Sequence, residues 1–184
     1  MAWRAPMMMA AALMAWPALA QTSAPSSTSA TYGNWTVTCV QNADQKVCQM
    51  VTRLNLKDGE GQLRPLIEVA IGQPAGGGDL RIVLQVPMDV ALRQPLVVSV
   101  DAAGADPAAT AKPQTDLLSA SYFACVPAGC IADAVLDQAS LATLQAAPTM
   151  TATFTTLNGA RKIAVPVALA GFGDAWAALG VAAP

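Results

Sequence analysis

Short segments in which apolar and polar residues alternate recur along the chain and constrain its fold. The clearest runs from Leu80 to Val86, where every second residue is apolar. A two-residue period is typical of a β-strand that buries one face. The chain has about eight such segments, and a ninth stretch at 131–136 extends the set; the eight lie at residues 35–39, 48–54, 67–71, 80–86, 96–100, 117–125, 149–155 and 163–169.

Two segments instead predict helices. Asp137 stands at a capping position before residues 138–147, and Pro148 ends that run. Asp174 is expected to cap a short C-terminal helix that holds Trp176. With no strand–helix alternation, these elements predict an all-β fold: an antiparallel β-sandwich or barrel-like fold with one internal and one short C-terminal helix.

The N-terminus has the features of a secretory signal peptide. Arg4 precedes an apolar run from Met7 to Leu19, and small residues stand at Ala18 and Ala20. The run is shorter than the roughly 20 residues of a membrane-spanning helix. We therefore expect residues 1–20 to be removed, residues 21–31 to form a flexible leader, and residues 32–184 to form one domain, periplasmic or secreted, with no membrane span.

Charge disfavours two classes of partner. Loss of Arg4 leaves nine of the ten basic residues against twelve acidic ones, a net charge of −3, and no basic run occurs. Nucleic acids and anionic membranes are recognised by clustered Lys and Arg, so neither is an expected partner.

Four cysteines follow the predicted cleavage site: Cys39, Cys48, Cys125 and Cys130. An even number after a signal peptide predicts disulfides in an oxidising compartment, and four cysteines allow three connectivities. Cys39 and Cys48 fall on the inward face of a predicted hairpin, and Cys125 and Cys130 flank a four-residue turn containing Pro127 and Gly129. The local pairs, Cys39 with Cys48 and Cys125 with Cys130, are therefore predicted.

The chain contains no histidine, which excludes a Ser-His-Asp triad, a Cys-His pair and His-based zinc sites. Asp133 and Asp137 remain a candidate acid/base pair, although Asp137 is also the expected helix cap. Four residues separate Cys125 from Cys130, which does not match a redox-active Cys-X-X-Cys motif. No catalytic residue, metal or cofactor is predicted, and the ligand-binding residues stay unknown. Trp35 and Trp176 are expected to belong to the core or to a lid over it rather than to line a ligand pocket.

Several short motifs together resemble the invasion-associated locus B family of alphaproteobacteria and related Gram-negative bacteria. The chain departs from that pattern at Asp89, where Gly is expected, and in a long loop between residues 101 and 116, interpreted as a tolerated insertion. The motifs span the mature chain almost end to end: Tyr32-Gly33-Asn34-Trp35 with Cys39 and Cys48, Val83 to Pro87, Val98 to Asp101, Phe123 to Ala132, and Val167 to Phe172.

The resemblance implies a secreted or periplasmic all-β domain without known enzymatic activity, linked in some pathogens to entry into host cells. Together with the missing catalytic groups, it predicts a non-catalytic binding protein of the envelope whose partner is an envelope or host protein. Two alternatives stay open: a carboxylate-based hydrolase of envelope glycans and a structural or chaperone-like periplasmic protein.

Overall fold

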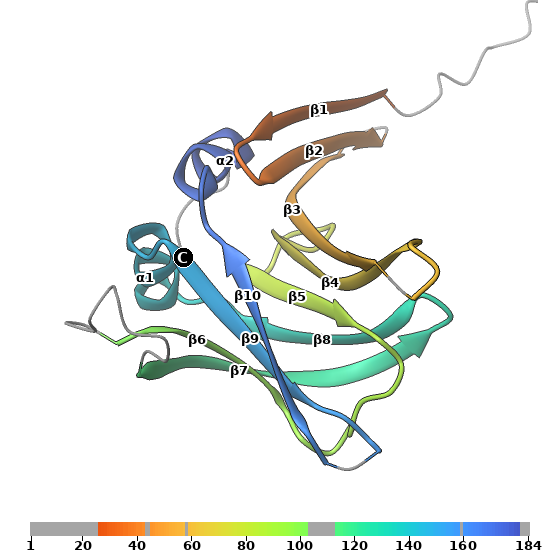
Figure 1. The fold of residues 1–184 in the computed structure, drawn as a ribbon. Helices are drawn as coiled ribbons and strands as arrows, with labels where there is room; N and C mark the ends of the chain where they lie inside the picture. Colours follow the sequence, from red (N-terminus) through yellow and green to blue (C-terminus); the bar gives the residue numbers. More distant parts are fainter. Residues whose placement is uncertain (1–25, 43–44, 58, 103–112, 159, 181–184) are drawn as a thin grey trace, which may run out of the picture.

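The computed structural model describes residues 26–42, 45–57, 59–102, 113–158 and 160–180 of the 184-residue chain. In these ranges the chain forms one antiparallel sheet of ten strands and two short helices (Figure 1). The elements are β1 (Ser26–Tyr32), β2 (Trp35–Asn42), β3 (Gln45–Lys57), β4 (Leu63–Gly72), β5 (Arg81–Val86), β6 (Leu96–Asp101), β7 (Gln114–Val126), β8 (Gly129–Val135), α1 (Gln138–Ala146), β9 (Thr149–Thr155), β10 (Lys162–Ala168) and α2 (Phe172–Leu179).

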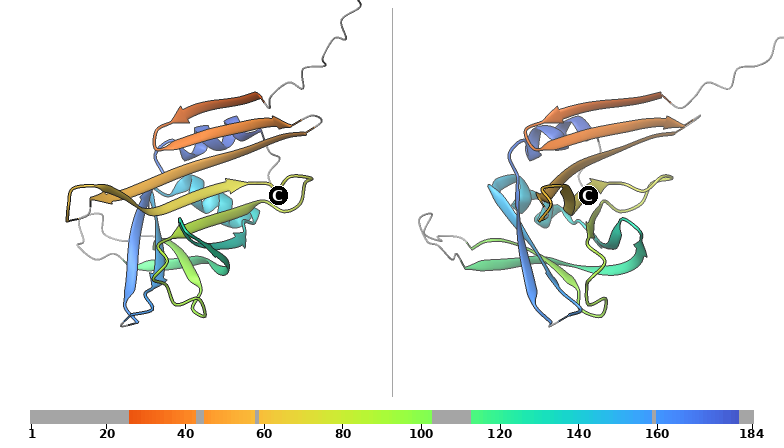
Figure 2. Two further views of the ribbon diagram at one scale, coloured as in Figure 1. Left: turned by 90° about the vertical axis from the view of Figure 1, so that its right-hand side faces the viewer. Right: turned by 45° about the vertical axis from the view of Figure 1, so that its right-hand side comes forward.

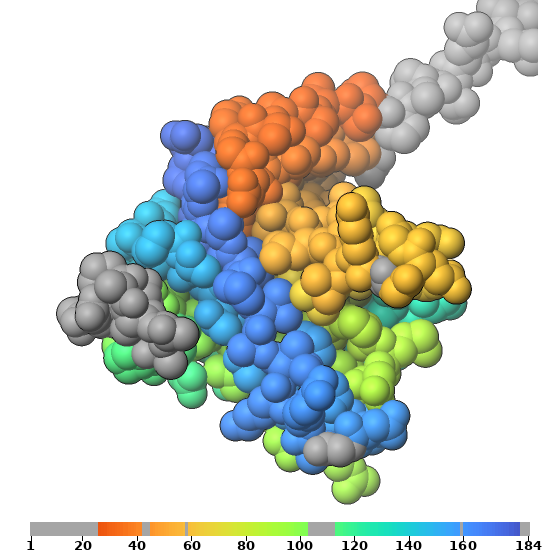
Figure 3. Space-filling model, in the orientation of Figure 1, coloured from red at the N-terminus to blue at the C-terminus, as the bar shows by residue number. Residues whose placement is uncertain are grey.

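The strand order is β1-β2-β3-β4-β5-β8-β7-β6-β9-β10, so the β6–β7–β8 meander is inserted between β5 and β9. The sheet is strongly curved, and both helices lie on one side of the molecule (Figures 1 and 2). The space-filling view shows the region of α2 directly against β1 (Figure 3). The expected all-β, antiparallel, barrel-like fold with one internal and one C-terminal helix is confirmed. No helix within the described residues is long and apolar enough to cross a membrane.

Alternation along the strands builds the core. In β5, Ile82, Leu84 and Val86 are buried while the residues between them are half-buried, and β9 repeats the pattern. Trp35 is fully buried, and Trp176 packs at the edge of the core, so both tryptophans have the predicted packing roles.

Helix α2 joins the two ends of the sheet, because it follows β10 and packs against β1, β2 and β3. The Trp35 and Phe172 rings meet edge to face, with their centroids 5.1 Å apart. The Asn34 N–H donates to the Ala170 carbonyl at 3.0 Å. Gly33 and Gly171 make this approach possible, since a Cβ on Gly171 would lie 2.2 Å from the Tyr32 carbonyl oxygen.

The first strand corrects an expectation. Residues 21–31 were predicted to be a flexible leader, but Ser26 to Thr31 belong to β1, which pairs in register with β2. The side chains of Ser26 to Thr31 are all exposed, so this strand buries no face. The sequence therefore has no alternation of apolar and polar residues here. Backbone hydrogen bonding to β2 holds this strand, and residue patterns do not report such bonding. Residues 1–25, with the predicted signal peptide, lie outside the described residues.

Other boundaries also differ. The described residues form ten strands rather than about eight, since β1 and β8 are full members of the sheet. The long loop is shorter than the predicted 101–116, because β6 includes Asp101 and β7 begins at Gln114; residues 103–112 are not described. Helix α2 begins earlier than predicted: its N-cap is Gly171, and Asp174 lies in the first turn. Asp137 caps α1 as predicted.

Candidate functional site

Four chain connections meet at the end of the barrel away from the helices. They are the β3–β4, β5–β6, β7–β8 and β9–β10 connections, which the antiparallel order places at corresponding strand ends. The β1–β2 turn has the same sense but packs against the start of α2 instead. In the left view of Figure 2 the β3–β4 hairpin lies at the left edge and the β9–β10 turn at the bottom.

This end holds most of the exposed apolar side chains. Eight large apolar side chains are exposed among the described residues, and seven of them belong to these four connections or the strand ends beside them; Val135, at the end of β8, is the exception. Leu56 and Leu63 lie on the β3–β4 hairpin. The other five we call the apolar tip: Met88, Leu92, Phe123, Val126 and Leu157.

Hydrogen bonds hold the β5–β6 connection against the β9–β10 turn. The Ala91 N–H donates to the Thr155 carbonyl at 2.8 Å, and the Leu157 N–H donates to the Asp89 carbonyl at 3.3 Å. The Asn158 side-chain amide donates to the Asp89 carboxylate at 3.3 Å. Asp89 therefore helps to position Leu157.

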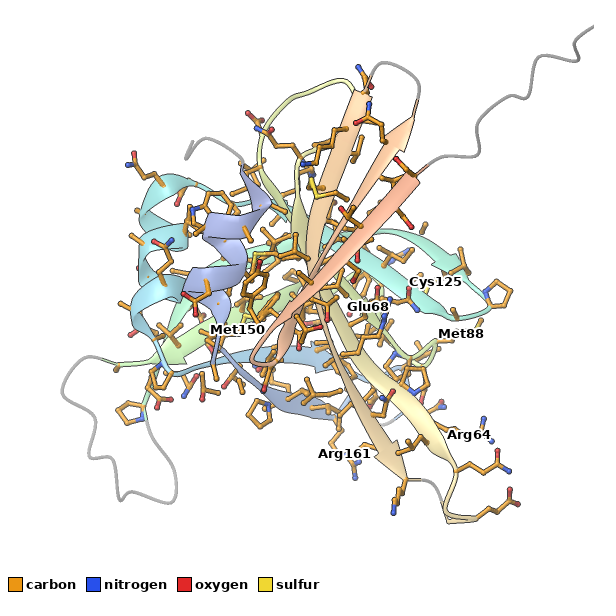
Figure 4. All side chains as sticks on the ribbon, turned by 90° about the horizontal axis from the view of Figure 1, so that it is seen from above. Arg64, Glu68, Met88, Cys125, Met150 and Arg161 are labelled. Carbon is orange, nitrogen blue, oxygen red and sulfur yellow. A yellow bond between two sulfur atoms is a disulfide. The ribbon has the colours of Figure 1, made fainter. Side chains whose placement is uncertain are left out.

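The β7–β8 turn is joined to strand β5 and to the β5–β6 connection. The Gln85 side-chain amide donates to the Ala128 carbonyl at 3.0 Å, and the Cys130 sulfur lies 3.9 Å from the Met88 carbonyl oxygen. Gly129 permits this approach, since a Cβ there would lie 2.3 Å from the Val86 carbonyl oxygen. Figure 4 shows Met88 and Cys125 close together on the side away from the helices.

A β-bulge exposes Phe123. The β7–β8 register pairs Tyr122 with Ala132 and Ala124 with Ile131, so Phe123 is the extra residue. Bulges redirect side chains, and Phe123 is 64% exposed whereas Tyr122 is half-buried. Burial raises the pKa of Tyr122 to about 12, so its hydroxyl stays protonated at physiological pH.

Basic residues gather around the apolar tip. The β5–β6 connection contains Arg93, and Arg161 and Lys162 follow the β9–β10 turn; all three are exposed. Asp89 is the one acidic residue in these two connections and the β7–β8 turn. Lys57, Arg64 and the acidic Glu60 lie on the β3–β4 hairpin, and Figure 4 shows Arg64 toward the tip of that hairpin.

Both disulfides join directly opposed residues of neighbouring strands. Cys39 is bonded to Cys48 across β2 and β3, and Cys125 to Cys130 across β7 and β8, each with a Cα–Cα distance of 4.0 Å. The predicted pairing is the one in the structure. Cys125 ends a strand and does not precede a helix, which fits a structural clasp behind the apolar tip rather than a redox centre.

The candidate carboxylates have separate partners. Asp133 accepts from Nε and Nη2 of Arg81, on the neighbouring strand β5. Asp137 accepts from the Ser140 N–H at 2.7 Å, and its pKa is lowered by hydrogen bonds from the backbone and then the side chain of Ser140. A carboxyl group with a lowered pKa is ionised at neutral pH, so Asp137 is unsuited to act as a general acid.

Two hollows are poor in catalytic groups. One of about 440 Å³ lies beside Cys48 and the end of α2, and Lys46 is its one charged lining residue. One of about 680 Å³ lies between α1 and β6, with Asp101 as its one charged lining residue. No cluster of three or more metal-ligating side chains occurs in the described part of the chain.

Comparison with known proteins agrees with this architecture. A family model described as invasion associated locus B (IalB) protein matches residues 35–180. The chain belongs to the invasion associated locus B family. An "Invasion protein B homolog" of Brucella abortus strain 2308 is 26% identical over 145 residues, which cover 79% of this chain and 75% of that protein; a homolog from B. abortus biovar 1, strain 9-941, gives the same values.

The fold also matches a solved structure. The crystal structure of invasion associated protein B from Bartonella henselae aligns with a TM-score of 0.63 at 25% identity, covering 83% of this chain and 94% of that one. The family motifs of the sequence have identifiable structural roles here. Trp35 meets Phe172, and Gly33 lies against Ala170 and Gly171, where α2 joins the sheet. Phe123 to Cys130 form the bulge and clasp at the apolar tip.

Sequence reasoning did not find the apolar tip. The sequence does contain a feature that points to it: three large apolar residues, Met88, Leu92 and Leu157, lie in segments that read as turns. Their neighbours in those segments include Pro87, Arg93 and Asn158. Their gathering at one end depends on the strand order, which residue patterns leave open.

Proposed function

We propose that this protein is exported, is not an enzyme, and works as a binding module that contacts another component of the bacterial envelope or of a host cell through the apolar tip. Periplasm and external medium are the proposed compartments. The gathering of exposed Met, Leu, Phe and Val side chains at one end is the observation that carries this proposal, because large apolar side chains that are exposed together mark interaction sites.

Other features support the absence of catalysis. Asp133 and Asp137 are held by Arg81 and by the first turn of α1, and no cysteine in the structure is free. The paired cysteines and the signal-peptide pattern support export, because disulfides persist in oxidising compartments.

A site-specific photo-crosslinker at Met88, compared with one at Val135, tests the proposal in cells. Both side chains are exposed, at 60% and 47%, but they lie at opposite ends of the barrel. We expect Met88 to give crosslinks to envelope or host components that Val135 does not give. Equal crosslinking from the two positions, or recovery of the protein in the cytosol with free thiols, would contradict the proposal.

A further inference from the structure

We infer that the apolar tip docks on the surface of an anionic phospholipid bilayer. This inference rests on the proposed function and names the surface that is contacted. The contact would be peripheral, with side chains of the tip entering the headgroup region and basic residues beside them contacting lipid phosphates.

The shape of the tip suits a bilayer. Its five side chains belong to three different connections, the β5–β6 loop, the end of the β7–β8 hairpin and the β9–β10 turn, and they project from chain reversals. Met88, Phe123 and Leu157 are 60%, 64% and 67% exposed. Side chains that project separately are accommodated by the soft interface of a membrane, whereas a protein partner needs a closely matched, well-packed surface.

The charge around the tip favours an anionic surface. Arg93, Arg161 and Lys162 outnumber Asp89 in the three connections, a local formal charge of +2 on a chain whose net charge is −2. Asp89 is also engaged by Asn158. Basic residues beside exposed apolar side chains are the combination that binds membrane interfaces, where anionic lipids attract Lys and Arg.

The framework behind the tip limits its motion. The Cys125–Cys130 disulfide and the contacts that Asp89 and Gln85 make with neighbouring turns join the three connections. A surface that is already ordered loses less conformational entropy on binding. The clasp and the bulge at Phe123 therefore have a role in presenting the tip.

Vesicle co-sedimentation tests this inference. The protein is recovered from the periplasmic or culture fraction, and all variants share one N-terminus, so its contribution cancels between them. We expect sedimentation with vesicles that mix phosphatidylcholine and phosphatidylglycerol, weak sedimentation with phosphatidylcholine alone, and loss of binding in high salt, because salt screens charge contacts.

Two pairs of variants locate the contact. The double variant Met88→Ser, Leu157→Ser should weaken binding to anionic vesicles by about tenfold or more. Each apolar side chain that leaves water on binding contributes to the affinity for the membrane. Val135→Ser is the matched control. Arg161→Glu with Lys162→Glu should weaken binding by more than about fivefold per residue, and Lys46→Glu, away from the tip, should not. Unfolding curves establish that each variant is folded.

The inference is overturned if the wild-type protein does not sediment with anionic vesicles at low salt, or if Val135→Ser and Lys46→Glu weaken binding as much as the tip variants. Crosslinks from Met88 to a protein, without vesicle binding, would overturn the lipid inference and leave the proposed function standing. If the protein does not bind vesicles and also gives no crosslinks specific to Met88, both the lipid inference and the proposed function are rejected.

Discussion

At the scale of single residues, two glycines decide how the β1–β2 turn meets the segment that leads into α2. Gly171 has a φ of 84° and lies against the backbone of Tyr32, so Gly171→Ala would bring its Cβ into a carbonyl that cannot move aside. We expect the free energy of unfolding to fall by about 2 kcal/mol or more. Urea unfolding measures the change.

Gly180→Ala is the matched control for that substitution. Gly180 has a φ of 68°, but no atom lies within 4 Å of a Cβ built there, so its substitution has the backbone cost without the collision. If both variants lose equal stability, the close approach of Gly171 to Tyr32 does not constrain the fold.

Asp137 links stability to pH. Its folded-state pKa is lowered, so the ionised carboxylate stabilises α1 above the ordinary Asp pKa of about 3.9, and this contribution is lost as the pH falls through the lower folded-state value. Asn also caps helices but does not titrate. The difference in unfolding free energy between wild type and Asp137→Asn should therefore shrink on acidification. A difference that is constant across the acidic range would refute the role of the charge.

At the scale of elements, the two disulfides lock two hairpins and should stabilise unequally. Their cysteines are 9 and 5 residues apart in the sequence. In the chain-entropy model each bridge contributes about 2 to 3 kcal/mol, and the longer loop about 0.5 kcal/mol more than the shorter. Chemical unfolding of the two double Cys→Ala variants should give a lower midpoint for the Cys39/Cys48 pair. The reverse order would show that packing around Cys130 outweighs chain entropy.

Strand β1 should be the least protected strand of the sheet. It lies at an edge, and its side chains from Ser26 to Thr31 are exposed, whereas β5 is central and buries every second side chain. Local opening needs less energy where few apolar contacts hold an element. Amide hydrogen exchange should therefore be faster in β1 than in β5, and equal protection in the two strands would contradict this explanation.

At the scale of the whole molecule, α2 covers the core between the two edge strands of the sheet, β1 and β10. A chain that ends at Leu169 would lack Phe172 and expose Trp35, which is fully buried. We expect red-shifted Trp35 fluorescence, binding of a hydrophobic dye and loss of cooperative unfolding, because the core would lose part of its packing. A chain that begins at Tyr32, without most of β1, is the control and should unfold cooperatively. If both truncated chains behave alike, α2 is not needed to close the core.

At the same scale, charges that are dispersed along the sequence can come together in space. No basic run occurs in the chain, and this argued against an anionic membrane. Arg93 and Arg161 are far apart in sequence, yet the β5–β6 and β9–β10 connections bring them to one end. The inferred membrane contact would therefore use basic residues that are dispersed along the chain.

Local patterns alone determined much of this protein. Period-two alternation predicted most of the strands, Asp137 and Pro148 bounded α1, and the hairpin positions of the four cysteines predicted their pairing, because these features depend on residues near one another in sequence. Only the tertiary structure decided the insertion of β6–β8 beside β5, the pairing of the exposed strand β1, the contact of Gly33 with Gly171 and the apolar tip. These features depend on strand order and on backbone contacts between distant segments, and neither leaves a periodic trace in the residues.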